Sequence, residues 1–249
     1  MLVPIYLIAV SALTPRESAF DFPKSIIPRA VSIDTITFFL GASGVIDSFW
    51  RSVVVALATL GLSLLIGAPA GYAVARHAFR GRSTYRLAIL STRAFPIVIL
   101  AIPLAVTYRL WGIDDTILGV ALMHTALALP FTVLITSSVF MSVPRELEEA
   151  AQTLGCNPLQ AFLRVSLPLT LPGLAAAAIF TWVLSWNDVF AAVILTLQNP
   201  TLPAKILSAL TQSPIYYQFA AGFVMLIPSL VVIFVIRKYL LGLWGRVVK

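Results

Sequence analysis

Charge and cysteine are both scarce in this sequence. Only 11% of the 249 residues are charged, whereas soluble domains carry about 25%. A soluble domain of this length would need more polar surface than these residues can supply. The single cysteine, Cys156, excludes an internal disulfide, and the two histidines are too far apart in the chain to predict a metal site.

The sequence also lacks a GxxxxGK[ST] motif, the glycine-rich loop that cradles the phosphates of ATP. We therefore expect no ATP hydrolysis by this chain, no catalytic residue and no cofactor of its own. The net charge of +7 does not indicate nucleic-acid binding, because that function needs a basic face on a soluble scaffold. The opening residues MLVPIYLIAV lack a basic region, so no cleavable signal peptide is expected.

Apolar residues are abundant: 59% of the chain is hydrophobic and the mean hydropathy is +0.96. A helix crosses a bilayer with about 20 predominantly apolar residues, so the long apolar runs predict an all-α integral membrane protein with six transmembrane helices. The run at 2–13 would reach only ~18 Å at 1.5 Å per residue, which predicts a first helix that is short or truncated at its N-terminus. The other predicted spans are 51–75, 87–108, 116–140, 169–197 and 219–236.

The lysines and arginines predict the orientation of these spans. More than half of them, including a cluster at 76–86, fall on one side of a six-span topology. Cytoplasmic segments carry such an excess, so a multi-pass protein with a cytoplasmic C-terminus is expected. The predicted division is a first span with an extracytoplasmic loop over 1–47, a membrane domain over 48–237 and a cytoplasmic tail over 238–249.

A polar stretch, ELEEAAQTLGCNPLQAFLRVSLP, separates the fourth and fifth predicted spans on the cytoplasmic side. Pro144 suits the first position of a helix, and Gly155 can end that helix with a positive φ. Asn157, Pro158 and Gln160 have the spacing of a capping box that starts a second helix. The sequence therefore predicts two short helices joined at the glycine.

This helix–turn–helix has two possible roles. It could be a solvated connection between spans, as most such loops are. Against this, Leu147, Ala150 and Ala151 form a small apolar face that no other segment obviously covers. Such a face suits docking into a groove on another protein.

The same stretch resembles the EAA loop of the membrane subunits of ABC importers. Leu154 and Cys156 depart from the usual Asp and Ala of that loop, but the helix–glycine–helix pattern remains. The resemblance implies a coupling helix that sits in a cleft of a cytoplasmic ATPase, with Glu148, Glu149, Ala150, Ala151 and Gly155 as the coupling residues. The matching positions are Glu149, Ala150, Ala151, Gly155, Val165, Leu167 and Pro168.

Two further segments extend the resemblance over nearly the whole chain. GYAVARHAFRGR resembles the end of a span and the basic turn that follows it in this family. SWNDVFAAVILT resembles a stretch of the carbohydrate importers, a branch that includes the smaller membrane subunit of the maltose importer. The ending KYLLGLWGRVVK departs from the usual tail of that branch.

The resemblance implies a type-1 ABC transmembrane permease domain over 48–237 and a function in translocating an oligosaccharide or polyol across the inner membrane. It implies a second, homologous permease subunit, two ATP-binding subunits that hold ATP and Mg²⁺, and an extracytoplasmic solute-binding protein. Three alternatives remain: an ABC permease for a polyamine, sulfate or phosphate; an ion-coupled secondary transporter; and a membrane scaffold.

Four residues near or within the predicted spans are candidates for the substrate path: Arg93, Trp186, Asn187 and Asp188. Ionisable groups at membrane depth usually face a bundle interior or a water-filled cavity, and Trp186 could offer a flat face to a sugar ring. The alternatives are an arginine that reaches the headgroups, a contact with the partner subunit, and an interfacial tryptophan. His124, with no second ligand near it in sequence, is expected to be a hydrogen-bonded core residue.

Overall fold

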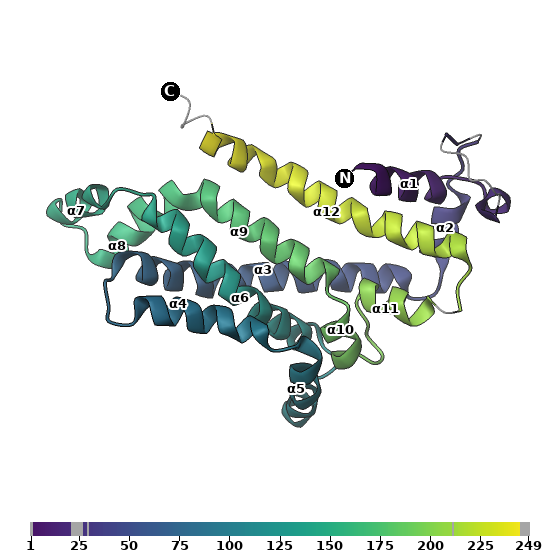
Figure 1. Cartoon of the computed structure of the whole chain (residues 1–249), viewed down its shortest axis with the longest axis horizontal. Coiled ribbons are helices and arrows are strands. Elements are labelled where there is room, and N and C mark those ends of the chain that lie inside the picture. Colours follow the sequence, from purple (N-terminus) through teal and green to yellow (C-terminus); the bar gives the residue numbers. More distant parts are fainter. Residues whose placement is uncertain (1, 21–26, 29, 211, 245–249) are drawn as a thin grey trace.

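The computed structural model describes residues 2–20, 27–28, 30–210 and 212–244, and within these it contains helices and no strand. This confirms the all-α prediction. The longest helices run roughly along the long axis of the molecule (Figure 1). They are α3 (Val45–Arg76), α6 (Ile117–Met141), α9 (Leu167–Asn187) and α12 (Ile215–Trp244).

Fewer continuous spans are present than the six predicted. Within the described residues, four helices are long and apolar enough to cross a membrane, and a fifth span results if one bent pair is counted as a unit. The first helix, α1 (Leu2–Ala12), has 11 residues and a length of only ~16 Å at 1.5 Å per residue. The four are Val45–Arg76, Ile117–Met141, Pro158–Asn187 and Ile215–Arg237.

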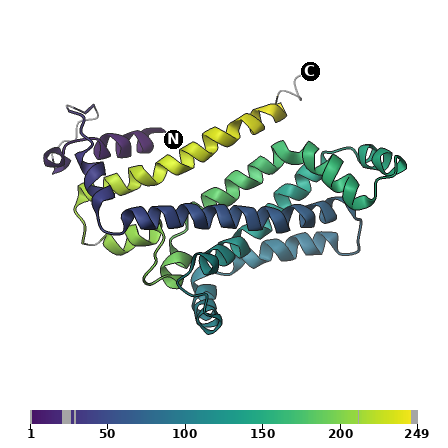
Figure 2. The same cartoon turned by 180° about the vertical axis from the view of Figure 1, so that it is seen from behind.

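The predicted span 87–108 is not a single helix. It is divided between α4 (Arg82–Ser91) and α5 (Ile97–Trp111), which meet at 84°, and α5 projects away from the bundle (Figures 1 and 2). Pro96 accounts for the break, because a proline disfavours the helical conformation at the residue before it. Phe95 is accordingly extended, with φ −76° and ψ 124°.

The predicted span 169–197 is also divided. It begins earlier, with α8 (Pro158–Ala161) and a π-helical turn at Phe162–Ser166 leading into α9. The helix also ends earlier than predicted, at Asn187, because Asp188 adopts an extended conformation. A separate short helix, α10 (Phe190–Leu195), follows. Uniform hydropathy located this run but gave no sign of its breaks.

The predicted boundaries and loops need correction as well. The stretch between the first two predicted spans contains η1 (Arg16–Phe20) and α2 (Asp34–Gly41), and the stretch between the last two contains α11 (Leu202–Ala209). The last helix continues beyond the predicted boundary at 237, and residues 238–244 belong to α12. The rest of the predicted tail, 245–249, lies outside the described residues.

Helix α6 is the centre of the bundle and contacts α3 very closely. The carbonyl oxygen of Gly67 accepts a hydrogen bond of 3.0 Å from the Thr136 hydroxyl. A Cβ atom at Gly71 would overlap the Thr136 side chain, so only glycine permits this approach. Small residues at such crossings let membrane helices associate backbone to backbone.

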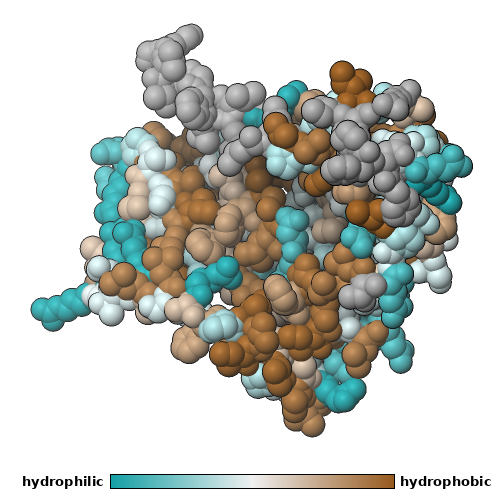
Figure 3. Space-filling model, turned by 45° about the vertical axis from the view of Figure 1, so that its right-hand side comes forward, coloured by the Kyte–Doolittle hydropathy of each residue, from teal (hydrophilic) through white to brown (hydrophobic). Residues whose placement is uncertain are grey.

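The surface has the distribution expected for a membrane-embedded bundle. Figure 3 shows hydrophobic side chains over the middle of one face, with hydrophilic side chains mainly toward its two edges. Large apolar side chains such as Leu65, Ile102 and Leu110 are exposed. A lipid core or a partner subunit can cover this surface, whereas water cannot do so without cost.

The two ends of the bundle differ. Helices α7 (Arg145–Thr153) and α8 lie at one end of the long axis, and α2 and α11 lie at the other (Figure 1). Helix α12 runs from the α11 end toward the α7 end. The polar loop and the described C-terminal end therefore face the same way.

Candidate functional site

The helix–turn–helix predicted between the spans is present. Gly155 has φ +95°, and the Cys156 N–H closes the end of α7 by donating to the carbonyl oxygen of Ala151 at 3.0 Å. The capping box of Asn157 and Gln160 at the start of α8 is confirmed, with hydrogen bonds of 2.8 and 3.0 Å. Pro144 precedes the helix as its N-cap rather than occupying the first helical position.

The outer side of this loop is uncovered within the chain. Leu154 at the turn is 87% exposed, and Leu147 and Leu159 are also exposed. Glu149 and Ala150 are exposed, while Ala151 is half-buried. An apolar surface on a polar loop at the end of a bundle is available to a partner protein.

Glu148 points the other way, into the bundle. Its carboxylate accepts hydrogen bonds from Arg76 Nε at 2.7 Å, from the Tyr72 hydroxyl at 2.8 Å and from the Ser166 hydroxyl at 2.5 Å. Arg76 and Tyr72 belong to the end of α3, and Ser166 belongs to the π-helical turn. One side chain therefore joins α7 to two other segments.

This environment keeps Glu148 ionised. Burial alone would raise the pKa of its carboxyl group, because the charged form loses hydration. The hydrogen bonds from Ser166, Tyr72 and Arg76, together with the positive charge of Arg76, outweigh burial and hold the pKa below its ordinary value. The sequence did not predict this network, because Arg76 and Glu148 are 72 positions apart.

Arg93 and Asp188 line one cavity of ≈ 320 Å³. Arg93 lies in the break between α4 and α5, where its Nη1 donates to the carbonyl oxygen of Leu127 at 3.0 Å and its guanidinium is 5.1 Å from the centre of the Phe131 ring. The structure thus brings together two of the four predicted path residues. The cavity is lined by Thr92, Arg93, Phe95, Pro96, Ile97, Leu127, Leu184 and Asp188.

Asp188 is held by hydrogen bonds from α10 and by a contact with His124. Its Oδ2 accepts from the backbone N–H groups of Ala191 and Ala192, in the first turn of α10, at 3.1 and 3.3 Å, and lies 3.2 Å from Nε2 of His124. His124 is fully buried and its Nδ1 lies 2.8 Å from the Ser185 hydroxyl. The prediction that His124 is a hydrogen-bonded core residue is confirmed.

Trp186 and Asn187 do not line this cavity. The Trp186 ring is fully buried, stacks on Trp182 with 5.7 Å between ring centres, and donates from Nε1 to the carbonyl oxygen of Met225 at 2.9 Å. It therefore has no open face for a sugar ring, contrary to expectation. Asn187 is exposed and its amide bonds the carbonyl oxygen of Val183 at 2.9 Å, within its own helix.

Comparison with known proteins identifies the family. Residues 63–241, which include the α7–α8 loop and the Arg93–Asp188 cavity, match the family described as binding-protein-dependent transport system inner membrane component. The chain belongs to this family. It is therefore a membrane component of a transport system, as the family resemblance of the polar stretch implied.

Two relatives of the chain are named for different transported solutes. The chain is 31% identical over its whole length to 92% of the trehalose transport system permease protein SugB of Mycobacterium tuberculosis. It is 30% identical over 87% of its length to 87% of the molybdate/tungstate transport system permease protein WtpB of Thermococcus kodakarensis. Similarity of this order is found to permeases named for a sugar and for an oxyanion.

A solved structure shares the fold. A chain from a bacterial ABC transporter involved in the import of the acidic polysaccharide alginate superposes with a TM-score of 0.73, at 21% identity. The superposition covers 96% of this chain and 90% of the other. The chain therefore shares its overall fold with that chain of the alginate transporter.

Proposed function

We propose that this chain is the membrane-spanning permease subunit of an ATP-driven ABC importer that moves an oligosaccharide or a polyol into the cytoplasm. The observation that carries the proposal is the uncovered α7–α8 loop with its turn at Gly155, in a member of the family. A transporter that worked alone would have no use for a docking surface at this end.

The loop would enter a cleft of an ATP-binding subunit. Glu149, Ala150, Ala151 and the turn at Gly155 form the contact surface, and Glu148 fixes its orientation from inside. Two such subunits would hold ATP and Mg²⁺, so this chain supplies no catalytic group. A second, homologous permease and an extracytoplasmic solute-binding protein complete the assembly. In this arrangement the protein is multi-pass in the inner membrane, with α7 and the C-terminus cytoplasmic.

Motion of the ATP-binding subunits would reach the spans through Glu148. Displacement of α7 pulls on Arg76 at the end of α3 and on Ser166 at the approach to α9, because the Glu148 carboxylate bonds both. Through the backbone alone, α7 would transmit force only to α6, which precedes it in the chain, and to α9, which follows the loop. The side-chain link adds α3, so three spans respond together.

The Arg93–Asp188 cavity is our candidate for part of the substrate path. Its lining offers one guanidinium and one carboxylate among mostly apolar side chains. Sugar hydroxyls can accept from the first and donate to the second. An oxyanion path would want several cations and a polyamine path several carboxylates, so a neutral polyhydroxylated solute suits this lining best. Trp186 is fully buried and Asn187 lies outside the cavity lining, so we do not include either residue in the proposed path.

Purification from detergent with a tag on this chain tests the assembly. Wild type should retain an ATPase and a second permease. Gly155→Pro and Glu149→Lys should lose the ATPase and keep the second permease, because only the docking loop is altered. If wild type purifies alone and transports in liposomes without ATP, the proposal is wrong and a secondary transporter takes its place.

Transport by the reconstituted complex tests the substrate class. ATP-dependent uptake of radiolabelled disaccharides and polyols should exceed that of molybdate, sulfate and spermidine. Arg93→Gln should reduce sugar uptake while leaving ATPase recovery unchanged, because Arg93 lies in the span region, away from the docking loop. Uptake of an oxyanion or polyamine alone would overturn the sugar assignment.

A further inference from the structure

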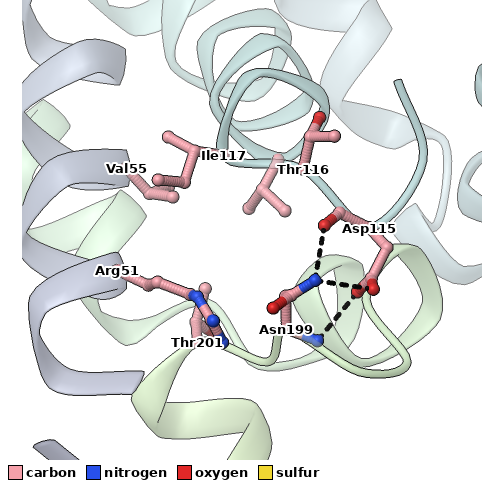
Figure 4. A pocket seen from close by; sticks show the side chains of 8 residues that line it. Arg51, Val55, Asp115, Thr116, Ile117, Asn199 and Thr201 are labelled. Carbon is pink, nitrogen blue, oxygen red and sulfur yellow. Dashed lines mark hydrogen bonds between the residues drawn. The ribbon is translucent and has the colours of Figure 1, made fainter. Parts of the chain in front are cut away.

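A second, smaller cavity lies near the α11 end of the bundle, away from α7. It has a volume of ≈ 210 Å³ between α3, the start of α6 and the loop before α11. Figure 4 shows Arg51 reaching from α3 toward Asn199 and Thr201, with Asp115 on the far side. Val55 and Val120, both almost completely buried, are among its lining residues.

The one carboxylate in this lining is already fully engaged. Asp115 accepts from the backbone N–H groups of Leu197, Gln198 and Asn199 at 2.9, 3.2 and 3.0 Å, and from the Asn199 side-chain amide at 2.9 Å. These hydrogen bonds occupy both oxygens of the carboxylate, and among the described residues Asp115 forms no ion pair with Arg51. Asp115 is therefore not the counter-ion of Arg51.

Arg51 has no hydrogen-bond or ion-pair partner among the residues that the structure describes. Its guanidinium nevertheless lines the cavity rather than extending into free space, and its side chain is only partly exposed. A guanidinium presents five N–H donors in a fixed fork that fits carboxylate and phosphate oxygens. Arg51 is thus a cation without a direct partner among the described residues, and the other charged residue of the lining, Asp115, is bonded to the loop before α11 instead.

Two further features of the cavity favour negative charge. The Thr201 hydroxyl is buried, lines the cavity and has no hydrogen-bond partner, although buried hydroxyls are normally bonded. Thr201 is also the N-cap of α11, an eight-residue helix, and its own side chain makes no capping hydrogen bond; the first N–H of the helix, that of Leu202, donates to the Ser52 hydroxyl at 2.7 Å. A helix N-terminus carries a partial positive charge.

From these observations we propose that the cavity is a binding site for one oxyanion group, a phosphate or a carboxylate. Arg51 would bind two of its oxygens, and the Thr201 hydroxyl would donate to one of them. The cavity volume leaves room for one such group and a few water molecules, since a water occupies about 30 Å³. The group is free in solution or carried on a lipid headgroup, and both sources present the same oxygens.

Thermal unfolding of the purified full-length complex tests the site, with inorganic phosphate as the probe. Phosphate is titrated against chloride at constant ionic strength, for wild type, Arg51→Gln and Thr201→Val. We expect saturable stabilisation of wild type and roughly tenfold weaker apparent affinity in Arg51→Gln, because a charge-assisted pair is lost. Thr201→Val should lose less, since it removes one neutral donor and keeps the side-chain shape.

Arg109→Gln is the matched control. The Arg109 side chain is 73% exposed, and its Nε lies 3.6 Å from Oδ2 of Asp114 in a surface ion pair. It should respond to phosphate as wild type does. Native mass spectrometry of delipidated complex, with and without added phosphatidylglycerol, distinguishes a lipid headgroup from a free anion. Arg51-dependent binding of either supports the site. No binding, or equal binding by wild type and Arg51→Gln in both arms, overturns it.

Discussion

Glu148 and Arg76 form a buried ion pair that fastens α7 to the end of α3. Arg76 approaches the Glu148 carboxylate through Nε at 2.7 Å and Nη2 at 2.5 Å, and both side chains are 8% exposed. Arg76 also donates from Nη1 to the carbonyl oxygen of Val143 at 3.0 Å, which fixes the entry to α7. The α7–α8 loop is therefore held in position by side chains as well as by the backbone.

Glu148→Ala should destabilise the protein strongly. Removing one partner of a buried ion pair leaves the other charge unpaired, at a cost of about 3–5 kcal/mol. Thermal unfolding in detergent measures the effect. Glu146→Ala, an exposed acidic position in the first turn of the same helix, is the control and should change the stability by about 0.5 kcal/mol or less. Equal effects of the two substitutions would contradict the role of the pair.

The Glu148 pair should also make stability depend on pH. The pKa of Glu148 is lower in the folded protein than the ordinary value of 4.5, so the folded state favours the ionised form. Its contribution is complete above the unfolded pKa and is lost as pH falls through the lower, folded pKa. The unfolding temperature of wild type should therefore exceed that of Glu148→Gln at pH 7, and the gap should narrow below pH ~4. A gap independent of pH would show that ionisation of Glu148 is irrelevant.

Asp115→Ala should release the loop that precedes α11. Asp115 is the only non-glycine residue with positive φ, at 54°, among those described, and its carboxylate binds three consecutive backbone N–H groups. Alanine would lose these bonds and is less tolerant of that backbone conformation, for a combined cost of about 2–4 kcal/mol. Hydrogen exchange at Leu197, Gln198 and Asn199 should accelerate.

Asp115→Asn is the comparison for the loop, because asparagine tolerates positive φ and retains one acceptor oxygen. Exchange at the same three amides should increase less than in Asp115→Ala. Unchanged protection in Asp115→Ala would mean that other contacts hold the loop.

Two glycines of α3 should respond oppositely to alanine. At Gly71 a Cβ atom would overlap Thr136 and approach the backbone nitrogen of Ser137, whereas at Gly61 nothing lies within 4 Å. Gly71→Ala should cost about 1–3 kcal/mol through overpacking. Gly61→Ala should stabilise by up to about 1 kcal/mol, because alanine is the better helix former. Unfolding midpoints of the two variants decide this, and a stabilising Gly71→Ala would contradict the close packing of α3 on α6.

Residues close together in sequence made parts of this structure predictable. The capping box at Asn157 and Gln160 and the turn at Gly155 depend on a few neighbouring positions, and both were predicted. His124 was correctly assigned to the hydrogen-bonded core because it lies within a predicted span and has no second ligand near it in sequence. The docking role of the loop remains a proposal.

The errors arose where distant residues or single breaks decide the structure. Hydropathy alone predicts one span over 87–108. Pro96 divides this stretch, and Arg93 lies at the bend between α4 and α5. Glu148 and Glu149 are adjacent and chemically equal, yet one is buried because Arg76, 72 positions away, meets it. The polar neighbours of Trp186 in sequence suggested an exposed aromatic residue. Only its packing against Trp182 shows that it is buried.

The contact between α3 and α6 determines how this bundle can move. The Thr136 hydroxyl bonds the Gly67 carbonyl across it, and Thr132 lies 3.2 Å from Thr181 of α9, oxygen to oxygen. Sliding one of these helices past another would break polar contacts that the membrane interior cannot replace. We therefore expect α3, α6 and α9 to rotate as one rigid unit. Alternating access would then occur by rotation of this unit against the other helices, without sliding between the three.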